Sequence, residues 1–191
     1  MATPTLICVL ALAAVLVGNA AAQQAPQQGP SVQAPSSPDA PPVAIGPGWR
    51  YEKRGAGGGP DLHVFHCQQP HCVPPSAVSY RLYAPNRTMT LEQFRREQEE
   101  IVRALEQRTA PGTRITVLEI KGDEGSGPPR MFVTRRLTEQ PNGTREFRVS
   151  STLLGVSHSA TLISTSPDEK AATANHSMFV IAVMLFINQR R

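Results

Sequence analysis

The sequence predicts an α+β domain with a mainly antiparallel sheet of about six to seven strands and two main helices. Seven short runs between residues 49 and 165 are rich in β-branched and aromatic residues, and they show a period of two. Two longer segments have the apolar spacing and the capping residues of helices. The chain order is strands, a helix, four strands and a helix, which favours helices packed on the apolar face or faces of one sheet.

The first 22 residues predict a signal peptide. An apolar run at residues 6–17 precedes three alanines at residues 20–22, which fit a small-x-small cleavage site before Gln23. No Lys or Arg precedes the run, which departs from the usual pattern, and the run is shorter than the ~20 residues of a membrane anchor. Cleavage would remove Cys8 and leave no transmembrane segment in the mature chain. Arg far outnumbers Lys, which suggests a GC-rich bacterial genome. In a bacterium, cleavage of a signal peptide would give a periplasmic or secreted protein.

Residues 23–47 predict a disordered linker. They are rich in Gln, Pro, Ala and Ser and contain one charged residue, Asp39, so they bury too little apolar surface to offset the cost of ordering. Removing this segment should therefore leave the stability of the protein unchanged. Residues 48–191 are then predicted to form a single α+β domain of ordinary size.

The strands are expected on both sides of the first helix. The Gly-rich stretch at residues 55–60 predicts a hairpin connection between the first two strands, and Pro141-Asn142-Gly143 predicts a tight turn between the fifth and sixth. The seven runs lie at residues 49–53, 62–66, 77–83, 114–121, 130–138, 144–154 and 157–165.

The first helix is predicted to begin after Thr90, which forms a capping-box pattern with Gln93, and to end before Pro111-Gly112. Its apolar stripe at helical spacing consists of Leu91, Phe94, Ile101, Val102 and Leu105.

The second helix is predicted to start with Ser166 as the N-cap and Pro167 in the first turn, and to run to about Ile187. Its end, residues 178–187, is ten consecutive apolar residues, which are too few to span a bilayer. A helix that is apolar all round has to be covered on more than one side. It either packs deep against the sheet or leaves one side open for a partner, a lipid or a second copy. The candidate contact residues are Met178, Phe179, Val183 and Phe186.

A cluster of histidines and cysteines lies in "LHVFHCQQPHC", residues 62–72. Cys67 and Cys72 are an even pair in an exported chain, which predicts a disulfide. The alternative is a metal site made of His63, His66, Cys67, His71 and Cys72. Strand alternation opposes it, since His63 and His66 would point to opposite faces.

The remaining composition gives no reason to propose an enzyme, a cofactor or a nucleic-acid partner. The chain lacks a nucleophile-elbow motif, a phosphate loop and a pair of carboxylates suited to acid–base catalysis. The net charge is +4, but the arginines are dispersed and aromatic residues make up only 5% of the chain, unlike a nucleic-acid surface.

The end of the chain resembles a known family of domains. The strand "SATLISTS" followed by the capped helix "SPDEKAATANHSMFVIAVML" looks like the close of PsbP/Mog1-like domains, and one helix followed by four strands is similar too. The resemblance implies a small α/β/α sandwich with an antiparallel sheet, although the cysteine-bridged hairpin is not a feature of that fold. It also implies a binding or assembly factor, so we expect a non-catalytic module of the cell envelope. The apolar last helix suggests an unknown envelope protein, a lipid or a second copy as the partner. The alternative function is periplasmic metal binding through the His/Cys cluster.

Overall fold

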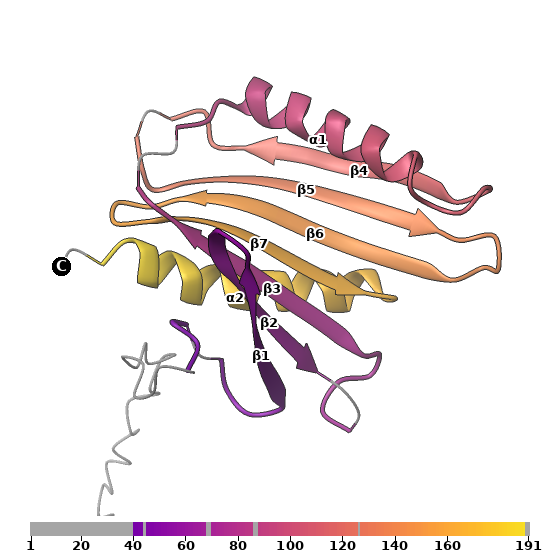
Figure 1. Cartoon of the computed structure of the whole chain (residues 1–191), viewed down its shortest axis with the longest axis horizontal. Coiled ribbons are helices and arrows are strands. Elements are labelled where there is room, and N and C mark those ends of the chain that lie inside the picture. The colour runs from indigo at the N-terminus through magenta and orange to yellow at the C-terminus, as the bar shows by residue number, and fades with distance from the viewer. Residues whose placement is uncertain (1–39, 44, 68–69, 86–87, 126, 190–191) are drawn as a thin grey trace, which may run out of the picture.

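Seven strands form one antiparallel sheet, and two helices pack on its opposite faces (Figure 1). The computed structural model describes residues 40–43, 45–67, 70–85, 88–125 and 127–189. The predicted fold class, with its strands and two helices in the predicted order, is confirmed. The strands are β1 (Trp49–Ala56), β2 (Gly59–Cys67), β3 (Ser76–Tyr83), β4 (Arg114–Gly122), β5 (Arg130–Glu139), β6 (Arg145–Leu154) and β7 (Ser159–Ser166), and the helices are α1 (Leu91–Glu106) and α2 (Glu169–Ile187).

The sheet order is β1-β2-β3-β7-β6-β5-β4, so β7 joins two meanders of three strands each. On β7, Ser164 pairs with Val78 of β3 on one side and with Val149 of β6 on the other. The sheet is strongly twisted, and β1 and β2 turn well away from the direction of β4 (Figure 1). The connection between the two three-stranded halves of the sheet therefore depends on β7.

Successive residues of each strand face opposite layers, as the period of two requires. On β6, Leu153 belongs to the core beneath α2, whereas Leu154 packs in a separate cluster with Phe94 of α1 and Phe132 of β5. α2 contacts β3, β6 and β7, and α1 contacts β4 and β5. The result is a three-layer α/β/α arrangement in which each helix covers a different part of the sheet.

The capping residues predicted for α1 are confirmed. The Thr90 Oγ1 accepts a hydrogen bond from the Gln93 backbone N–H at 3.1 Å, and the Gln93 Oε1 accepts one from the Thr90 backbone N–H at 2.8 Å. These two bonds satisfy donors that the first helical turn would otherwise leave unpaired.

The N-cap of α2 is Asp168, not Ser166 as the sequence pattern predicts. The Asp168 Oδ1 accepts a hydrogen bond from the Ala171 N–H at 2.7 Å. Ser166 still belongs to β7, where it pairs with Phe147, and its Oγ accepts a bond from the Asp168 N–H at 3.2 Å. Strand pairing thus delays the start of the helix by two residues.

The end of the predicted linker is part of the folded domain. Val43 is 1% exposed and lies in the core beneath α2, where its N–H donates to the Tyr80 Oη at 3.0 Å. Ile45 packs against the same core. The expectation that residues 23–47 can be removed without loss of stability is therefore corrected, because that truncation would delete a core residue. The predicted signal peptide and the linker up to residue 39 lie outside the described residues.

Candidate functional site

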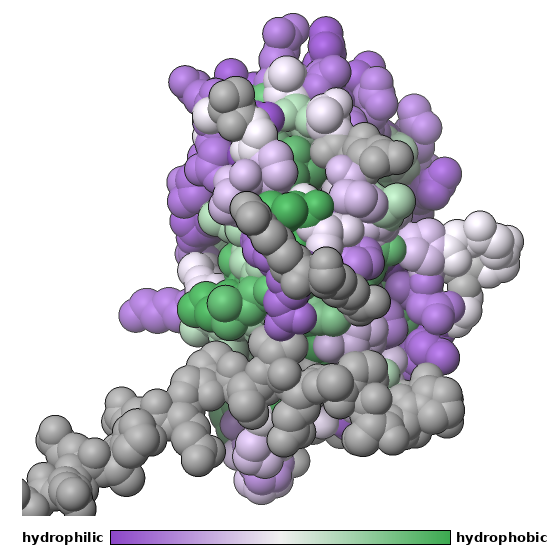
Figure 2. Space-filling view, turned by 90° about the vertical axis from the view of Figure 1, so that its left-hand side faces the viewer, coloured by the Kyte–Doolittle hydropathy of each residue, from purple (hydrophilic) through white to green (hydrophobic). Residues whose placement is uncertain are grey.

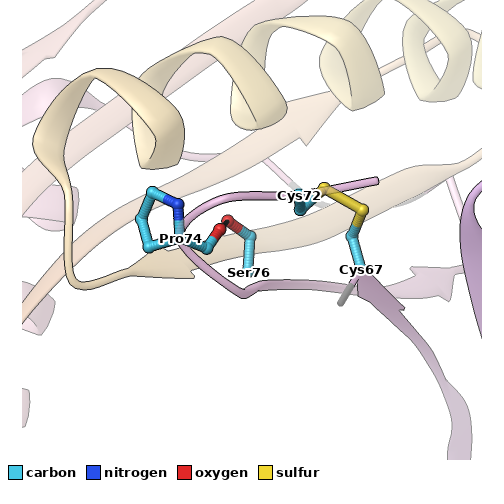
Figure 3. Close-up of a disulfide and its surroundings, with 4 residues drawn as sticks. All are labelled: Cys67, Cys72, Pro74 and Ser76. Atoms are coloured by element: carbon cyan, nitrogen blue, oxygen red, sulfur yellow. Dashed lines mark hydrogen bonds between the residues drawn. A yellow bond between two sulfur atoms is a disulfide. The ribbon is translucent and has the colours of Figure 1, made fainter. Parts of the chain in front are cut away.

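The disulfide predicted between Cys67 and Cys72 is present, with 5.6 Å between the two Cα atoms (Figure 3). Cys67 is the buried last residue of β2, so the bridge holds the loop that returns to β3. Near the end of this loop the Ser76 Oγ donates a hydrogen bond to the Pro74 carbonyl oxygen at 3.3 Å. On the chain-entropy model, closing so short a loop raises the free energy of unfolding by about 2 kcal/mol.

The histidines of the cluster lie on different sides of the sheet. His63 is buried beside Tyr80, with ring centroids 4.8 Å apart, and its Nδ1 lies 2.8 Å from the Tyr51 hydroxyl. Burial lowers the pKa of His63. His66 faces the opposite side, where its Nε2 lies 3.7 Å from a carboxylate oxygen of Glu52. Strand alternation predicted this separation.

The five residues of the alternative metal site do not converge. The sulfurs of Cys67 and Cys72 are bonded to each other, and the His71 side chain lies against Gly48. Within the described parts of the chain, no three His, Cys, Asp or Glu residues come together as a metal-binding group. His63, His66, Cys67, His71 and Cys72 therefore do not form a ligand set in this conformation.

Two of the four predicted contact residues on α2 are core residues. Phe179 and Val183 are fully buried, and the Phe179 ring meets the rings of Trp49 and Phe65 edge-on at 5.1 Å each. This part of the predicted contact surface is corrected, because the sheet occupies that side of the helix. Phe186 is half-buried against His158, with ring centroids 5.7 Å apart.

The fourth predicted residue, Met178, marks a different side of α2. Met178, Ile181 and Leu185 are 39%, 56% and 48% exposed, and we name these three residues the outer strip. An apolar groove of about 570 Å³ runs along this side of the helix. Its described lining consists of Pro129, Val180, Ile181, Met184, Leu185, Asn188 and Gln189. Figure 2 shows hydrophobic residues reaching the surface among hydrophilic ones at the end of the molecule where α2 finishes.

α2 is long and apolar enough to cross a membrane by length and composition alone. Six of its residues are nevertheless buried within the domain: Ala172, His176, Phe179, Ala182, Val183 and Ile187. The helix therefore packs one side into the domain and leaves another apolar side exposed.

The inner side of α2 also carries a histidine that local patterns did not single out. His176 is buried, and its Nε2 lies 3.1 Å from the Ser151 Oγ of β6. Burial lowers its pKa to about 4, and the nearby Lys121 acts in the same direction. The imidazole is therefore neutral in the folded protein at ordinary pH.

A pair of arginines lies on the face of the sheet that carries α1. Arg136 of β5 and Arg148 of β6 are direct cross-strand partners, and Arg136 is only 5% exposed. Burial, followed by the positive charge of Arg148, lowers the pKa of Arg136 to about 10. The sequence gives no local sign of this pair, because the two residues are brought together by the β5–β6 hairpin.

The comparison with solved structures shows the fold. The chain is similar to cyanobacterial PsbP (CyanoP) from Synechocystis sp. PCC 6803, with a TM-score of 0.53 and 11% sequence identity. The similarity covers 74% of this chain and 83% of the cyanobacterial one. No family model and no curated protein matches the chain. The predicted PsbP-like fold is therefore confirmed, while the low identity transfers no site residue.

Proposed function

We propose that this protein is an exported binding or assembly module of the cell envelope that docks on a partner protein through the outer strip of α2. The observation that carries the proposal is the exposure of Met178, Ile181 and Leu185 on a helix whose opposite side is core. Large apolar side chains that gather on one surface are typical of a contact site. The groove beside them offers space for apolar side chains of the partner.

A protein partner suits the groove better than a lipid surface. Helices that lie on membranes usually carry Lys or Arg beside their apolar strip, which adds attraction to anionic lipids. The described lining of this groove contains no charged residue, although Arg190 and Arg191 follow Gln189 in the sequence. Met178 and Met184 add flexible side chains, which adapt to irregular partner surfaces.

Export is supported by the disulfide and by the N-terminal pattern. Disulfides form and persist in oxidising compartments such as the bacterial periplasm. The only cysteine besides the bridged pair is Cys8, which the predicted cleavage after residue 22 would remove. Both observations fit a module that folds after it crosses the inner membrane.

In-cell photo-crosslinking tests the proposed docking site. A photoreactive residue replaces Ile181 in the full chain, and a matched control carries it at Val117, an apolar residue of β4 that is 39% exposed. We expect a discrete adduct with a different protein from position 181 and none of that size from position 117. Adding Leu185→Asp should remove the adduct and leave the melting temperature of the protein unchanged.

Other outcomes contradict the proposal. Adducts that contain only a second copy of this chain would assign the outer strip to self-association. Adducts with lipid alone would assign it to the membrane surface. The same adducts from both positions would show that contact at the outer strip is not specific.

A further inference from the structure

The β5–β6 hairpin extends past the end of β7 (Figure 1). Arg145, the first residue of β6, pairs with Glu139 of β5. The pairing of β6 with β7 begins only at Phe147, which lies opposite Ser166, the last residue of β7. The chain then turns away from the sheet into α2. Among the described strands, Arg145 and Glu146 therefore have a partner on one side only.

The backbone of Arg145 points into the space where β7 has ended. In an antiparallel pair, the N–H and C=O groups of successive residues point alternately toward the partner strand and away from it. The Gln140 N–H donates to the Thr144 carbonyl oxygen at 2.8 Å, so the backbone of Thr144 faces β5. The next residue, Arg145, therefore presents its N–H and C=O groups to the opposite side.

A cleft of about 400 Å³ lies in this space. One wall is the end of the β5–β6 hairpin and includes Thr144 and Arg145. The opposite wall is the region where β2 ends and β3 begins, and it includes Cys67 and Ala77. Because β7 lies between β6 and β3 in the sheet, its last residue, Ser166, closes the cleft between the two walls. The cleft is therefore a gap at the end of the sheet, on the line along which β7 would continue.

The two walls are fixed by bonds within the chain. The Cys67–Cys72 disulfide closes the loop between β2 and β3, so it holds the wall formed there. On the hairpin side, the Arg145 Nε and Nη2 donate to the Glu139 Oε1 at 2.9 and 2.8 Å. Glu146 accepts a hydrogen bond from the Arg148 Nη2 at 2.9 Å.

These ion pairs also decide the kind of ligand that the cleft suits. Arg145 and Glu146 line the cleft with opposite charges, and each charge is already balanced by a neighbouring side chain. A charged group that enters the cleft would lose hydration without gaining a new opposite charge from these two residues. The lining also includes Pro75, Ala77 and Pro167, which offer apolar surface. Both features favour an uncharged ligand.

We propose that this cleft binds a short, uncharged, extended peptide segment of another protein, which continues the sheet where β7 ends. The backbone of the segment pairs with the N–H and C=O groups of Arg145, as a strand does when it adds to an exposed sheet edge. Its small apolar side chains pack against the proline and alanine lining. The cleft lies beyond the N-terminal end of α2, whereas the outer strip lies toward the C-terminal end of that helix, so this inference does not depend on the proposed function.

Backbone NMR of the mature protein tests the site, with the peptide acetyl-Thr-Val-Thr-Val-amide as the probe. We expect the amide signals of Arg145 and Thr165 to shift in a saturable way as the peptide is added. The same peptide with methylated backbone nitrogens cannot donate to Arg145 and should bind at least tenfold more weakly. Shifts that grow linearly with the peptide, or equal binding of the methylated peptide, would overturn the proposal. Tighter binding of an analogue with Lys or Asp in place of the second Thr would overturn the assignment to an uncharged segment.

Variants of the hairpin locate the binding. Arg145→Pro removes the backbone N–H at the first residue of a strand, where Pro is tolerated. It should bind the probe at least tenfold more weakly than Arg145→Ala, which keeps that N–H, as seen at the Thr165 signal. The matched control is Arg114→Pro, which makes the same change at the exposed first residue of β4 and should leave the affinity unchanged.

Ala77→Phe gives a second test if Arg145→Pro does not fold. The larger side chain fills the cleft from the opposite wall and should abolish the shift of the Arg145 signal. An affinity that is unchanged in the folded site variants would overturn the proposal.

Discussion

Tyr80 ties the residues before the first strand to the sheet. Its hydroxyl accepts a hydrogen bond from the Val43 N–H at 3.0 Å and donates to the Val43 carbonyl oxygen at 3.3 Å. Both partners are buried, so no water replaces these bonds when the hydroxyl is removed. The end of the predicted linker is therefore held by one side chain of β3.

Tyr80→Phe should lower the free energy of unfolding by about 1–3 kcal/mol, because it leaves a buried backbone N–H and C=O unpaired. Denaturant unfolding of the wild type and the variant measures the difference. Tyr83→Phe, on the same strand but half-buried, is the matched comparison and should cost less. Equal stability of Tyr80→Phe and the wild type would show that Val43 does not depend on this contact.

His176 should make the protein less stable in mild acid. The unfolded chain binds a proton near pH 6.5, whereas the folded protein does so only near pH 4. Between these values the unfolded state binds more protons, so the free energy of unfolding falls as the pH drops from about 6.5 to about 4. The full loss is on the order of 3 kcal/mol. His63, whose pKa is also lowered, contributes in the same direction.

His176→Gln removes the titrating group and keeps a side chain that can bond Ser151. The variant should show a shallower fall in the free energy of unfolding between pH 6.5 and pH 4 than the wild type, when both are measured by urea unfolding. An identical pH dependence in the two proteins would refute the assignment.

At the scale of elements, α2 has two sides with different roles. Phe179, Ala182, Val183 and Ile187 contact the sheet, and the outer strip faces away from it. Phe179→Ala should therefore lower the free energy of unfolding by about 3–5 kcal/mol, since it leaves a cavity in the core. Ile181→Ala, two residues along the helix, should cost less than about 1 kcal/mol because that side chain is more than half exposed. Similar losses of unfolding free energy in Phe179→Ala and Ile181→Ala would contradict the assignment of a core side and an exposed side to α2.

Local sequence patterns predicted most helices, strands and turns, because these elements depend on residues that are close together in the sequence. The capping box of Thr90 and the turn at residues 141–143 are specified within four or five residues, and both form as predicted. The N-cap of α2 was predicted two residues early, because the pairing of Ser166 with Phe147 is a contact between distant parts of the chain.

The side of α2 that meets the sheet could not be read from the sequence. Ten consecutive apolar residues give the helix no polar side, so the pattern alone does not orient it. The orientation comes from β3, β6 and β7, which lie beneath the helix only after β7 inserts between the other two. The pairing of Arg136 with Arg148 depends in the same way on a contact between two strands, β5 and β6.

At the scale of the whole molecule, the last two elements close the fold. β7 joins the two meanders, and α2 covers the junction. The similarity to cyanobacterial PsbP at 11% identity shows that very different sequences reach this arrangement. The function must therefore be sought in the surfaces of this chain, among them the apolar outer strip of α2.

Binding of an apolar fluorescent dye to the mature protein, combined with light scattering, tests most directly whether the outer strip is an open contact surface. We expect the folded protein to bind the dye as a monomer, and Ile181→Ser together with Leu185→Ser to abolish dye binding without lowering the melting temperature. A clean monomer that binds no dye would contradict the account, because it would show that α2 is covered on every side and serves only as core.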